Sequence, residues 1–288
     1  AEYLLGIDGD ALLDPHAASW MLRHFQRDPA VAAVTGNPRI RNRSTLLGRV
    51  QVGEFSSIIG MIKRAQRTYG RIFTVSGVLV AFRKKALDRI GYWRDDMITE
   101  DIDVSWRLQF DHWDLHYVPN ALGYIYMPET FGGLWKQRLR WAMGGAQVLI
   151  KNIDVFTKPK LNFLWPLMFE LCLTLVWSYL MLAMALLWLV HFILPVPALA
   201  VVSSPFLPYG SGILLGATCL IQFALSKWMD SRYEPHLGKN YFWMIWYPFM
   251  FWLITVLASI VAFPKMLLRG EGKRARWISP ERGIKRDS

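Results

Sequence analysis

The sequence predicts an α/β domain followed by membrane-embedded helices, and three observations support this. Short apolar segments alternate with helical segments through the first 160 residues, which is typical of a sheet covered by helices on both faces. From residue 161 to residue 263, apolar runs dominate the chain. Lys and Arg gather beside those runs, at 136–160 and 265–286, as they do on the cytosolic flanks of membrane helices.

The elements of the α/β part follow from apolar periodicity and from residues that start or stop helices. Asp14-Pro15 opens the first helix, and Thr99 is the expected N-cap of another. We expect a mainly parallel sheet, because strands and helices alternate. The expected strands are 3–7, 31–34, 73–82 with a kink at its small residues, and 115–118; the expected helices are 17–27, 45–67, 99–109 and 132–149.

The helix expected at 132–149 mixes Trp and basic residues, which suits a membrane interface. Apolar segments at 163–194, 206–225 and 241–263 each supply the roughly 20 residues that a spanning helix needs. Their topology stays open. The uncharged loop 195–209 is typical of an external loop, whereas the basic tail is typical of a cytosolic one. One segment would then be interfacial or re-entrant, or an additional crossing would exist.

Composition excludes several classes of function. The net charge of +11 is compatible with nucleic acid, an acidic membrane or a phosphate-bearing substrate. We expect no nucleic acid partner, because no basic recognition helix or Arg/aromatic module is present. Cys172 and Cys219 are too few for a disulfide framework or a zinc site. The chain begins without Met, directly on an expected buried strand, so we expect a fragment of a longer protein.

Asp8-Gly9-Asp10 follows the first expected strand, at the edge where open α/β sheets bind ligands. Two carboxylates separated by one small residue can share a divalent cation that grips a diphosphate. The alternative is a surface turn, in which this pattern is common.

Thr99-Glu100-Asp101 opens a helix, and two interpretations compete. Thr followed by acidic residues is a good capping arrangement. In the functional alternative, Asp101 is a general base for a sugar hydroxyl, with Glu100 beside it raising its pKa.

Gln137, Arg140 and Trp141 lie at i, i+3 and i+4, and therefore on one helix face. Arg140, with Arg138 nearby, could steady a diphosphate, and a Trp ring suits the apolar face of a sugar. The alternative is an ordinary interfacial helix whose Arg and Trp reach the lipid headgroups.

The order of these three motifs, followed by membrane helices, resembles the processive inverting glycosyltransferases of family two, which have the GT-A fold and include cellulose, chitin and hyaluronan synthases. A narrower resemblance links the chain to the bacterial synthases of poly-β-1,6-N-acetylglucosamine. It is carried by residues 97–109, 127–130, 133–141 and 274–283.

This resemblance implies polymerisation of N-acetylglucosamine from UDP-N-acetylglucosamine, with a divalent metal, Mg²⁺ or Mn²⁺, held by Asp8 and Asp10. It implies Asp101 as the base, with Glu100 beside it. The implied substrate-binding residues are Asp8, Gln137, Arg138, Arg140 and Trp141. The implied partners are the growing polysaccharide, the lipid bilayer, a small two-helix membrane subunit and the activator cyclic di-GMP. The implied location is the bacterial inner membrane, with several crossings and a cytosolic catalytic domain.

The expected domains are a partial GT-A domain (1–126), an interfacial helix region (127–160), transmembrane helices (161–264) and a basic tail (265–288). The family's N-terminal membrane helices and first strands have no counterpart in these residues. Alternatives are a related synthase of a chitin-, hyaluronan- or cellulose-like polymer, a non-catalytic membrane scaffold, or a cyclic-dinucleotide-binding module built on the basic tail.

Overall fold

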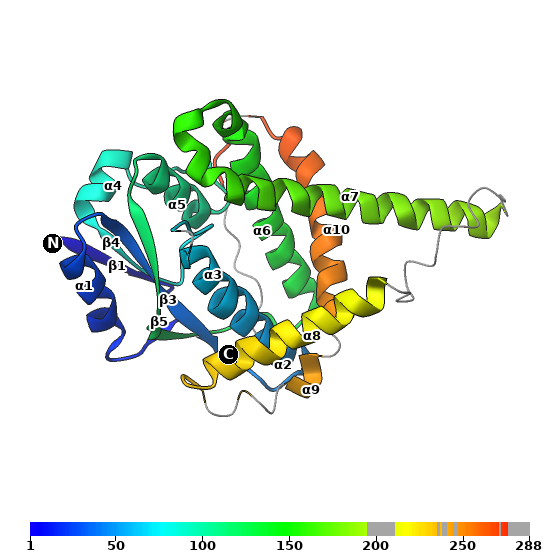
Figure 1. Cartoon of the computed structure of the whole chain (residues 1–288), viewed down its shortest axis with the longest axis horizontal. Helices are drawn as coiled ribbons and strands as arrows, with labels where there is room; N and C mark the ends of the chain where they lie inside the picture. Colours follow the sequence, from blue (N-terminus) through cyan, green and yellow to red (C-terminus); the bar gives the residue numbers. More distant parts are fainter. Residues whose placement is uncertain are drawn as a thin grey trace, which may run out of the picture.

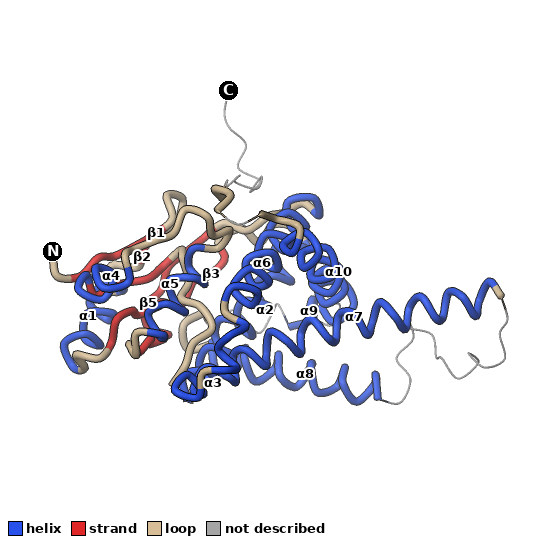
Figure 2. Tube along the Cα trace, turned by 90° about the horizontal axis from the view of Figure 1, so that it is seen from above, coloured by secondary structure: helices blue, strands red, loops and turns tan. Residues whose placement is uncertain are grey.

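The computed structural model describes residues 1–68, 70–194, 211–234, 237, 241–244, 247–270 and 272–275. A sheet with its covering helices forms one end of the molecule, and long helices form the other (Figures 1 and 2). This division agrees with the α/β part and the apolar part expected from the sequence.

The sheet is mixed, with the strand order β1-β4-β3-β5-β2. Only β3 and β5 run parallel, whereas β1 and β3 both pair antiparallel with β4, and β2 pairs antiparallel with β5. The expected mainly parallel sheet is therefore wrong. The segment expected as two strands over 73–82 forms a single strand after a turn, and that strand enters the sheet in the reversed direction. The strands are β1 (Tyr3–Ile7), β2 (Leu12–Leu13), β3 (Val31–Ile40), β4 (Leu79–Arg83) and β5 (Asp114–Ile125).

Helices cover both faces of this sheet, as the sequence predicts. On one face α1 (Ala17–Arg27) buries Met21 and Phe25 against the strands. On the other face α4 (Lys84–Ile90) and α5 (Glu100–Phe110) bury Leu87 and Leu108. The strongly amphipathic sequence of α1 explains its place, since its apolar stripe faces the strands and its polar stripe faces solvent.

The long helix expected at 45–67 exists, but it is not regular. It consists of α2 (Leu46–Phe55), a π-helical segment (Ser56–Ile62) and α3 (Lys63–Thr68). Glu54 and Lys63 are nine positions apart, which is about two and a half turns at 3.6 residues per turn and would put them on opposite faces of a regular helix. The π-helical turns contain more residues, which changes the angle between the two side chains around the helix axis. As a result, Glu54 and Lys63 line the same cavity.

The helical end begins with α6 (Phe131–Lys151), which lies beside α10 (Tyr247–Leu267) in both views (Figures 1 and 2). Two short 3₁₀ segments, Ile153–Thr157 and Pro159–Leu164, lead into α7 (Trp165–Ile193). The remaining helices are α8 (Ser211–Asp230) and α9 (Tyr241–Met244). Buried residues of α5, α6 and α7, among them Trp106, Val148 and Leu167, form one cluster that joins the two ends of the molecule.

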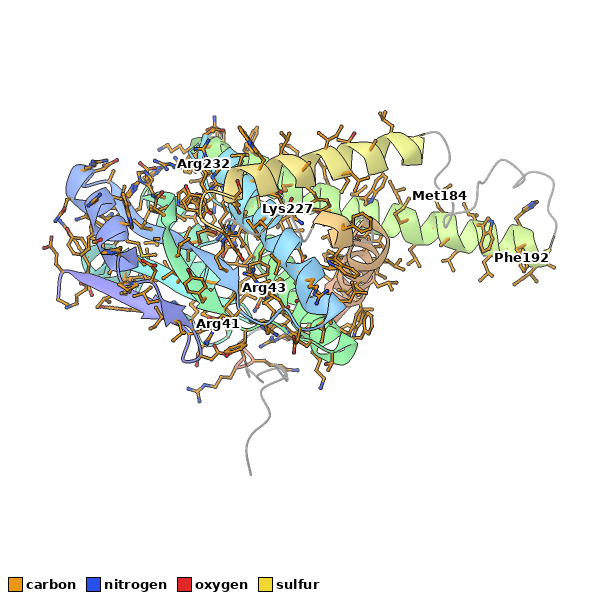
Figure 3. The ribbon with its side chains drawn as sticks, turned by 90° about the horizontal axis from the view of Figure 1, so that it is seen from below. Arg41, Arg43, Met184, Phe192, Lys227 and Arg232 are labelled. Atoms are coloured by element: carbon orange, nitrogen blue, oxygen red, sulfur yellow. The ribbon has the colours of Figure 1, made fainter. Side chains whose placement is uncertain are left out.

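Helix α7 projects from the body and exposes apolar side chains along its length. In Figure 3, Met184 and Phe192 lie on this projecting helix, whereas Arg41, Arg43, Lys227 and Arg232 lie over the body. Among the described residues, the helix spanning Pro159–Ile193 is the one with the length and apolarity to cross a bilayer, and Leu253–Leu267 is a shorter apolar stretch. The loop 195–209 and tail residues 276–288, on which the topology depends, lie outside the described residues.

A buried cluster of ion pairs fastens the end of α8 to the sheet domain. The Asp230 carboxylate accepts hydrogen bonds from Arg39 of β3 at 2.9 Å and from Arg64 of α3 at 2.8 Å. Arg43 and Arg39 also pair with Glu234. The Asp230 and Arg39 side chains are almost completely buried, so each charge depends on its partner.

Replacing Asp230 with alanine is expected to destabilise the protein by about 3 kcal/mol, because the buried Arg39 guanidinium would lose its 2.9 Å carboxylate partner and keep only the longer, 3.6 Å ion pair with Glu234. Thermal unfolding of the complete protein in detergent measures this effect. The control is Asp154→Ala, which breaks the exposed pair with Lys158 and should leave the unfolding temperature nearly unchanged. Equal effects of the two substitutions would contradict the role given to Asp230.

Candidate active site

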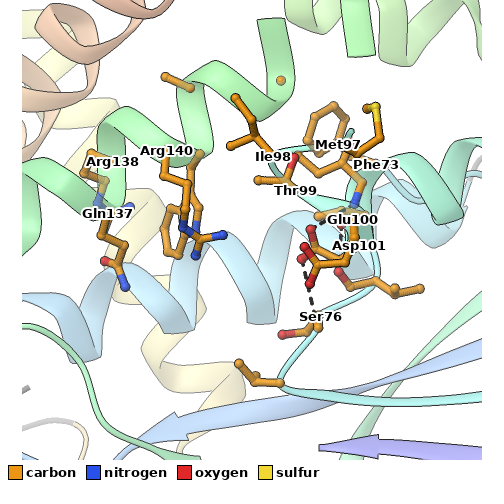
Figure 4. Close-up of a pocket in the computed structure, with 18 of the residues that line it drawn as sticks. Phe73, Ser76, Met97, Ile98, Thr99, Glu100, Asp101, Gln137, Arg138 and Arg140 are labelled. Carbon is orange, nitrogen blue, oxygen red and sulfur yellow. Dashed lines mark hydrogen bonds between the residues drawn. The ribbon is translucent and has the colours of Figure 1, made fainter. Parts of the chain in front are cut away.

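A cleft of about 1200 Å³ opens where the sheet domain meets the helices. Helix α6 forms one side, the start of α5 faces it, and the irregular helix of residues 46–68 lies behind them (Figure 4). Every site residue predicted from the sequence lines this cleft: Asp8, Asp10, Glu100, Asp101, Gln137, Arg138, Arg140 and Trp141. Residues more than 130 positions apart in the chain therefore converge on one cavity.

Asp8 and Asp10 follow the carboxyl end of β1. Pairing of Ile7 with Leu79 sets this end beside the turn at Ser76 and Gly77, which also lines the cleft. Two carboxylates offer hard oxygen ligands that suit Mg²⁺ or Mn²⁺, and a diphosphate would supply further oxygen ligands. The described residues contain no group of three or more His, Cys, Asp or Glu side chains that could hold a metal. Asp8 and Asp10 would supply part of the oxygen donor set of such a metal, and the diphosphate would supply the rest.

The position of Asp101 is fixed through its own helix. The Ser105 hydroxyl donates to the Asp101 carbonyl oxygen at 2.6 Å and accepts the backbone N–H of Val75 at 2.8 Å. The Asp101 carboxylate accepts the N–H of Ile102 at 2.9 Å and that of Gly77 at 3.4 Å. These bonds hold the carboxylate against the turn that neighbours Asp8 and Asp10.

Burial, and after it the neighbouring Glu100 carboxylate, raise the pKa of Asp101 to about 6. Arg140 and Lys63 act in the opposite direction, because each places positive charge near the carboxylate. Figure 4 shows the Arg140 guanidinium extending from α6 toward the carboxylates of Glu100 and Asp101. A carboxylate with a pKa near 6 is ionised at neutral pH and still basic enough to take a proton.

Thr99 is the N-cap residue of α5, as the sequence predicts, but its side chain accepts no hydrogen bond from the helix. Its hydroxyl is instead buried against Gly144 of α6, where a Cβ would come within 1.9 Å of Oγ1. From α6, Gln147 also accepts the N–H of Ile98 at 3.0 Å and donates to the Asp96 carbonyl at 3.0 Å. Helix α6 thus holds the segment that precedes Glu100 and Asp101.

Helix α6 also carries the second set of site residues. Gln137, Arg140 and Trp141 share its cleft-facing side, as their spacing predicts. Arg138 pairs with buried Glu54 through a 2.6 Å contact, and its guanidinium lies 4.5 Å from the centre of the Trp141 ring. Arg138 therefore orients Trp141, in addition to lining the cleft.

Sequence reasoning missed several residues that build this site, chiefly Glu54, Lys63, Ser105 and Gln147. Glu54, Lys63 and Gln147 belong to no recognisable motif, whereas Ser105 lies in the segment 97–109 that carries the family resemblance but was given no role there. A Lys within a long helix is usually exposed to solvent. Lys63 is instead only 4% exposed, and burial lowers its pKa to about 8, although Asp101 opposes this shift.

Three buried polar atoms along the cleft have no hydrogen-bond partner among the residues that the structure describes: Lys63 Nζ, Thr99 Oγ1 and Gln137 Oε1. Each such atom costs about 1–3 kcal/mol of stability. Thr99 Oγ1 is packed against Gly144, whereas Lys63 and Gln137 line the cleft from α3 and α6. A ligand rich in hydroxyl groups would satisfy both the Lys63 donor and the Gln137 acceptor.

The cleft does not end at the sheet domain. Thr174 of α7, with Thr255 and Ser259 of α10, also lines it. Hydroxyl-bearing side chains on otherwise apolar helices thus extend the cavity toward the helical end of the molecule.

Comparison with known proteins agrees with this geometry. Residues 3–264 match the family described as Glycosyl transferase family group 2. A poly-beta-1,6-N-acetyl-D-glucosamine synthase of Staphylococcus epidermidis is 43% identical, and one of Staphylococcus aureus is 41% identical. In each case the match covers 98% of this chain and 68% of the relative. A mannosyltransferase from Pyrobaculum calidifontis, solved with GDP-Man and Mn²⁺, has a TM-score of 0.57 at 19% identity, over 93% of this chain and 62% of that one. That structure supports a GT-A-like fold for this chain.

Proposed function

The chain belongs to the glycosyl transferase family group 2, and on that basis we propose that it polymerises N-acetylglucosamine from UDP-N-acetylglucosamine into a β-1,6-linked polysaccharide. The observation that carries the proposal is the convergence of Asp8, Asp10, Asp101, Gln137, Arg140 and Trp141 on one cleft. An acidic pair, a base and a sugar-stacking ring are the groups that a polymerising inverting transferase requires.

In the proposed reaction, the Asp101 carboxylate takes the proton of an acceptor hydroxyl. The hydroxyl oxygen then forms a bond to the anomeric carbon of the donor sugar. The bond from that carbon to the diphosphate breaks, and UDP leaves with the electron pair. A single displacement of this kind inverts the anomeric configuration and gives a β-linkage. Glu100 contributes by keeping the Asp101 carboxylate basic.

Asp8 and Asp10 would hold a divalent metal, and Asp8 would also face the donor. When bound there, Mg²⁺ or Mn²⁺ neutralises charge that develops on the leaving diphosphate. Arg140 points across the cleft and would stabilise the same charge from the α6 side. Gln137 Oε1, which no described residue hydrogen-bonds, would accept from sugar hydroxyls, and Arg138 stacks on the Trp141 ring and would orient it toward the sugar.

Membrane embedding and export are part of the proposal. The apolar side chains that α7 exposes suit a lipid environment (Figure 3). Residues 1–126 would be the catalytic domain, 127–160 an interfacial region, 161–264 the membrane part and 265–288 a basic tail. The polar lining of α7 and α10 would receive the growing chain.

The family resemblance extends the proposal to the setting of the enzyme. It would be a multi-pass protein of the bacterial inner membrane with its catalytic domain in the cytosol. A small two-helix membrane subunit would assist it, and cyclic di-GMP would activate the complex. The product would be a biofilm exopolysaccharide.

The decisive experiment supplies the complete protein, in membranes with its small partner, with radiolabelled UDP-N-acetylglucosamine or UDP-glucose and magnesium. The polymer is then digested with linkage-specific hydrolases. Sensitivity to a β-1,6-N-acetylglucosaminidase is expected. A chitin-, hyaluronan- or cellulose-like product would retain the family and overturn the substrate. No polymer from any donor would favour a non-catalytic scaffold.

Trp141→Ala is expected to slow elongation roughly five-fold and shorten the polymer, because an aromatic contact contributes about 1 kcal/mol. Donor binding should change little. The measurements are polymer length by gel filtration and the KM for UDP-N-acetylglucosamine. Trp20→Ala is a matched control, since Trp20 carries a similar stacked guanidinium, from Arg23 at 4.4 Å, on a helix away from the cleft. Unchanged polymer length in the Trp141 variant would refute the stacking role.

A further inference from the structure

Lys63 is a buried cation that the proposed reaction leaves without a task. It is the first residue of α3 and lines the cleft, and its Nζ has no hydrogen-bond partner among the described residues. An ammonium group offers three donors and carries a full charge, so burying it without a partner is unfavourable. A buried ammonium group that lines a cleft in this way points to a ligand that accepts its hydrogen bonds.

The Lys63 side chain reaches the cleft because the helix of residues 46–68 is irregular. The π-helical segment Ser56–Ile62 ends immediately before Lys63 and brings Lys63 to the face that Glu54 occupies. On a regular helix, Lys63 would point away from Glu54. Such π-helical segments are frequent at functional sites.

We call the part of the cleft that extends toward α7 and α10 its polymer side, because the growing chain would lie there in the proposed function. Lys63 lies on this side. A smaller hollow of about 300 Å³ adjoins β1 and is lined by Asp101 and Glu100, but not by Lys63. One turn beyond Lys63, Gln66 donates to Glu170 of α7 at 3.2 Å. The first turn of α3, which carries Lys63, therefore faces α7, one of the helices toward which the cleft extends.

The negative charge that acts on Lys63 is that of the proposed base, Asp101. Burial lowers the pKa of Lys63 and raises that of Asp101, and the attraction between the two charges opposes both shifts. Glu100 and Arg140 are the other charged groups that act on Asp101. An ammonium beside the base, on the polymer side, is well placed for the sugar that gives up its proton.

We propose that Lys63 is an acceptor-binding residue. Its ammonium donates a hydrogen bond to an oxygen of the terminal sugar of the growing polymer, and its charge keeps the Asp101 carboxylate ionised. The proton of the acceptor hydroxyl still moves to Asp101, and Lys63 stays protonated throughout. This inference rests on the proposed function, and it adds the residue that holds the acceptor.

The test compares Lys63→Met and Lys63→Arg in the complete protein in membranes, with Lys85→Met as an exposed control of the same charge change. Acceptors are β-1,6-linked N-acetylglucosamine oligosaccharides. Lys63→Met is expected to raise the KM for these acceptors about ten-fold or more, as for loss of a hydrogen bond from a charged group. The KM for UDP-N-acetylglucosamine should stay within about two-fold, because the donor does not contact Lys63 in this proposal.

The pH profile separates this role from a structural one. Wild-type activity should rise through about pH 6, as Asp101 loses its proton, and fall above about pH 8, as Lys63 loses its own. Lys63→Met removes the charge that favours ionised Asp101, so its acid limb should move to higher pH and its alkaline limb should disappear. Lys63→Arg should keep the acid limb and move the alkaline limb upward.

Thermal unfolding gives a readout independent of activity. Lys63→Met should unfold at a higher temperature than wild type, since it removes an unpartnered buried charge. A lower unfolding temperature with an unchanged pH profile would make Lys63 a structural residue and overturn the inference. Unchanged acceptor KM would overturn it as well, while polymer synthesis by the wild type would leave the proposed function intact. A wild type that makes no polymer from any donor would overturn both.

Discussion

Asp101→Asn is expected to abolish polymer formation, with a loss of about 10²–10⁴-fold in the rate of sugar transfer. This is the range that a positioned general base contributes. Asparagine keeps the size of the side chain, and its single oxygen can retain the hydrogen bond from Ile102, whose N–H donates to one carboxylate oxygen of Asp101 while Gly77 donates to the other. Its amide nitrogen can accept neither the Gly77 N–H nor the hydroxyl proton. The measurement is incorporation of radiolabelled N-acetylglucosamine by the complete protein in membranes.

The variant should be expressed and should bind UDP-N-acetylglucosamine as the wild type does. Asp111→Asn is the matched control, because Asp111 ends the same helix and pairs with Arg89 at the surface. It should retain nearly full activity. Substantial transfer by the Asp101 variant would refute its role as the base and would direct attention to Glu100.

Gly144→Ala is expected to lower the transfer rate about 100-fold, although Gly144 lies on a different helix from the base. An alanine Cβ would lie 1.9 Å from Thr99 Oγ1 and 2.7 Å from Thr99 Cβ, so the segment before Glu100 and Asp101 must move. Displacing a catalytic group by about 1 Å can cost about 100-fold in rate. Single-turnover transfer from UDP-N-acetylglucosamine measures the effect.

Gly132→Ala is the control for this variant, since it makes the same change in α6 at a position where a Cβ meets nothing within 4 Å. Donor binding by the Gly144 variant should persist, because the acidic pair is on another element. A Gly144 variant with normal activity would mean that the contact between α6 and Thr99 does not position the base.

Much of the sheet domain could be predicted from local pattern. The helix expected at 17–27 agrees with α1 residue for residue, because its apolar stripe and its flanking residues are strong local signals. Strand direction could not be predicted in this way. The pairing of β4 with β1 and β3 depends on the turn at Ser76 and Gly77, and nothing local distinguishes that turn from a kink within a strand.

In the candidate site, too, residues that belong to local motifs could be predicted from the sequence, whereas residues placed by long-range contacts could not. Asp8, Asp101 and Trp141 belong to motifs whose residue types reveal their chemistry, and they do converge on one cleft. Lys63 was missed because its position depends on the phase of a helix rather than on its neighbours in sequence. Thr99 occupies the predicted N-cap position, but the contact of its side chain with Gly144, 45 positions away, could not be predicted.

The π-helical segment Ser56–Ile62 has a consequence for how related sequences are compared. It acts as a phase shift within one continuous helix, so that residues before it and after it follow different helical registers. A relative that lacked one residue there could keep both halves of the helix and still turn its equivalent of Lys63 away from the cleft. The number of residues in this segment would then distinguish relatives that bind the acceptor through a lysine from relatives that do not. The distinction would hold even where the acidic pair, the Thr-Glu-Asp motif and the motif of α6 are the same.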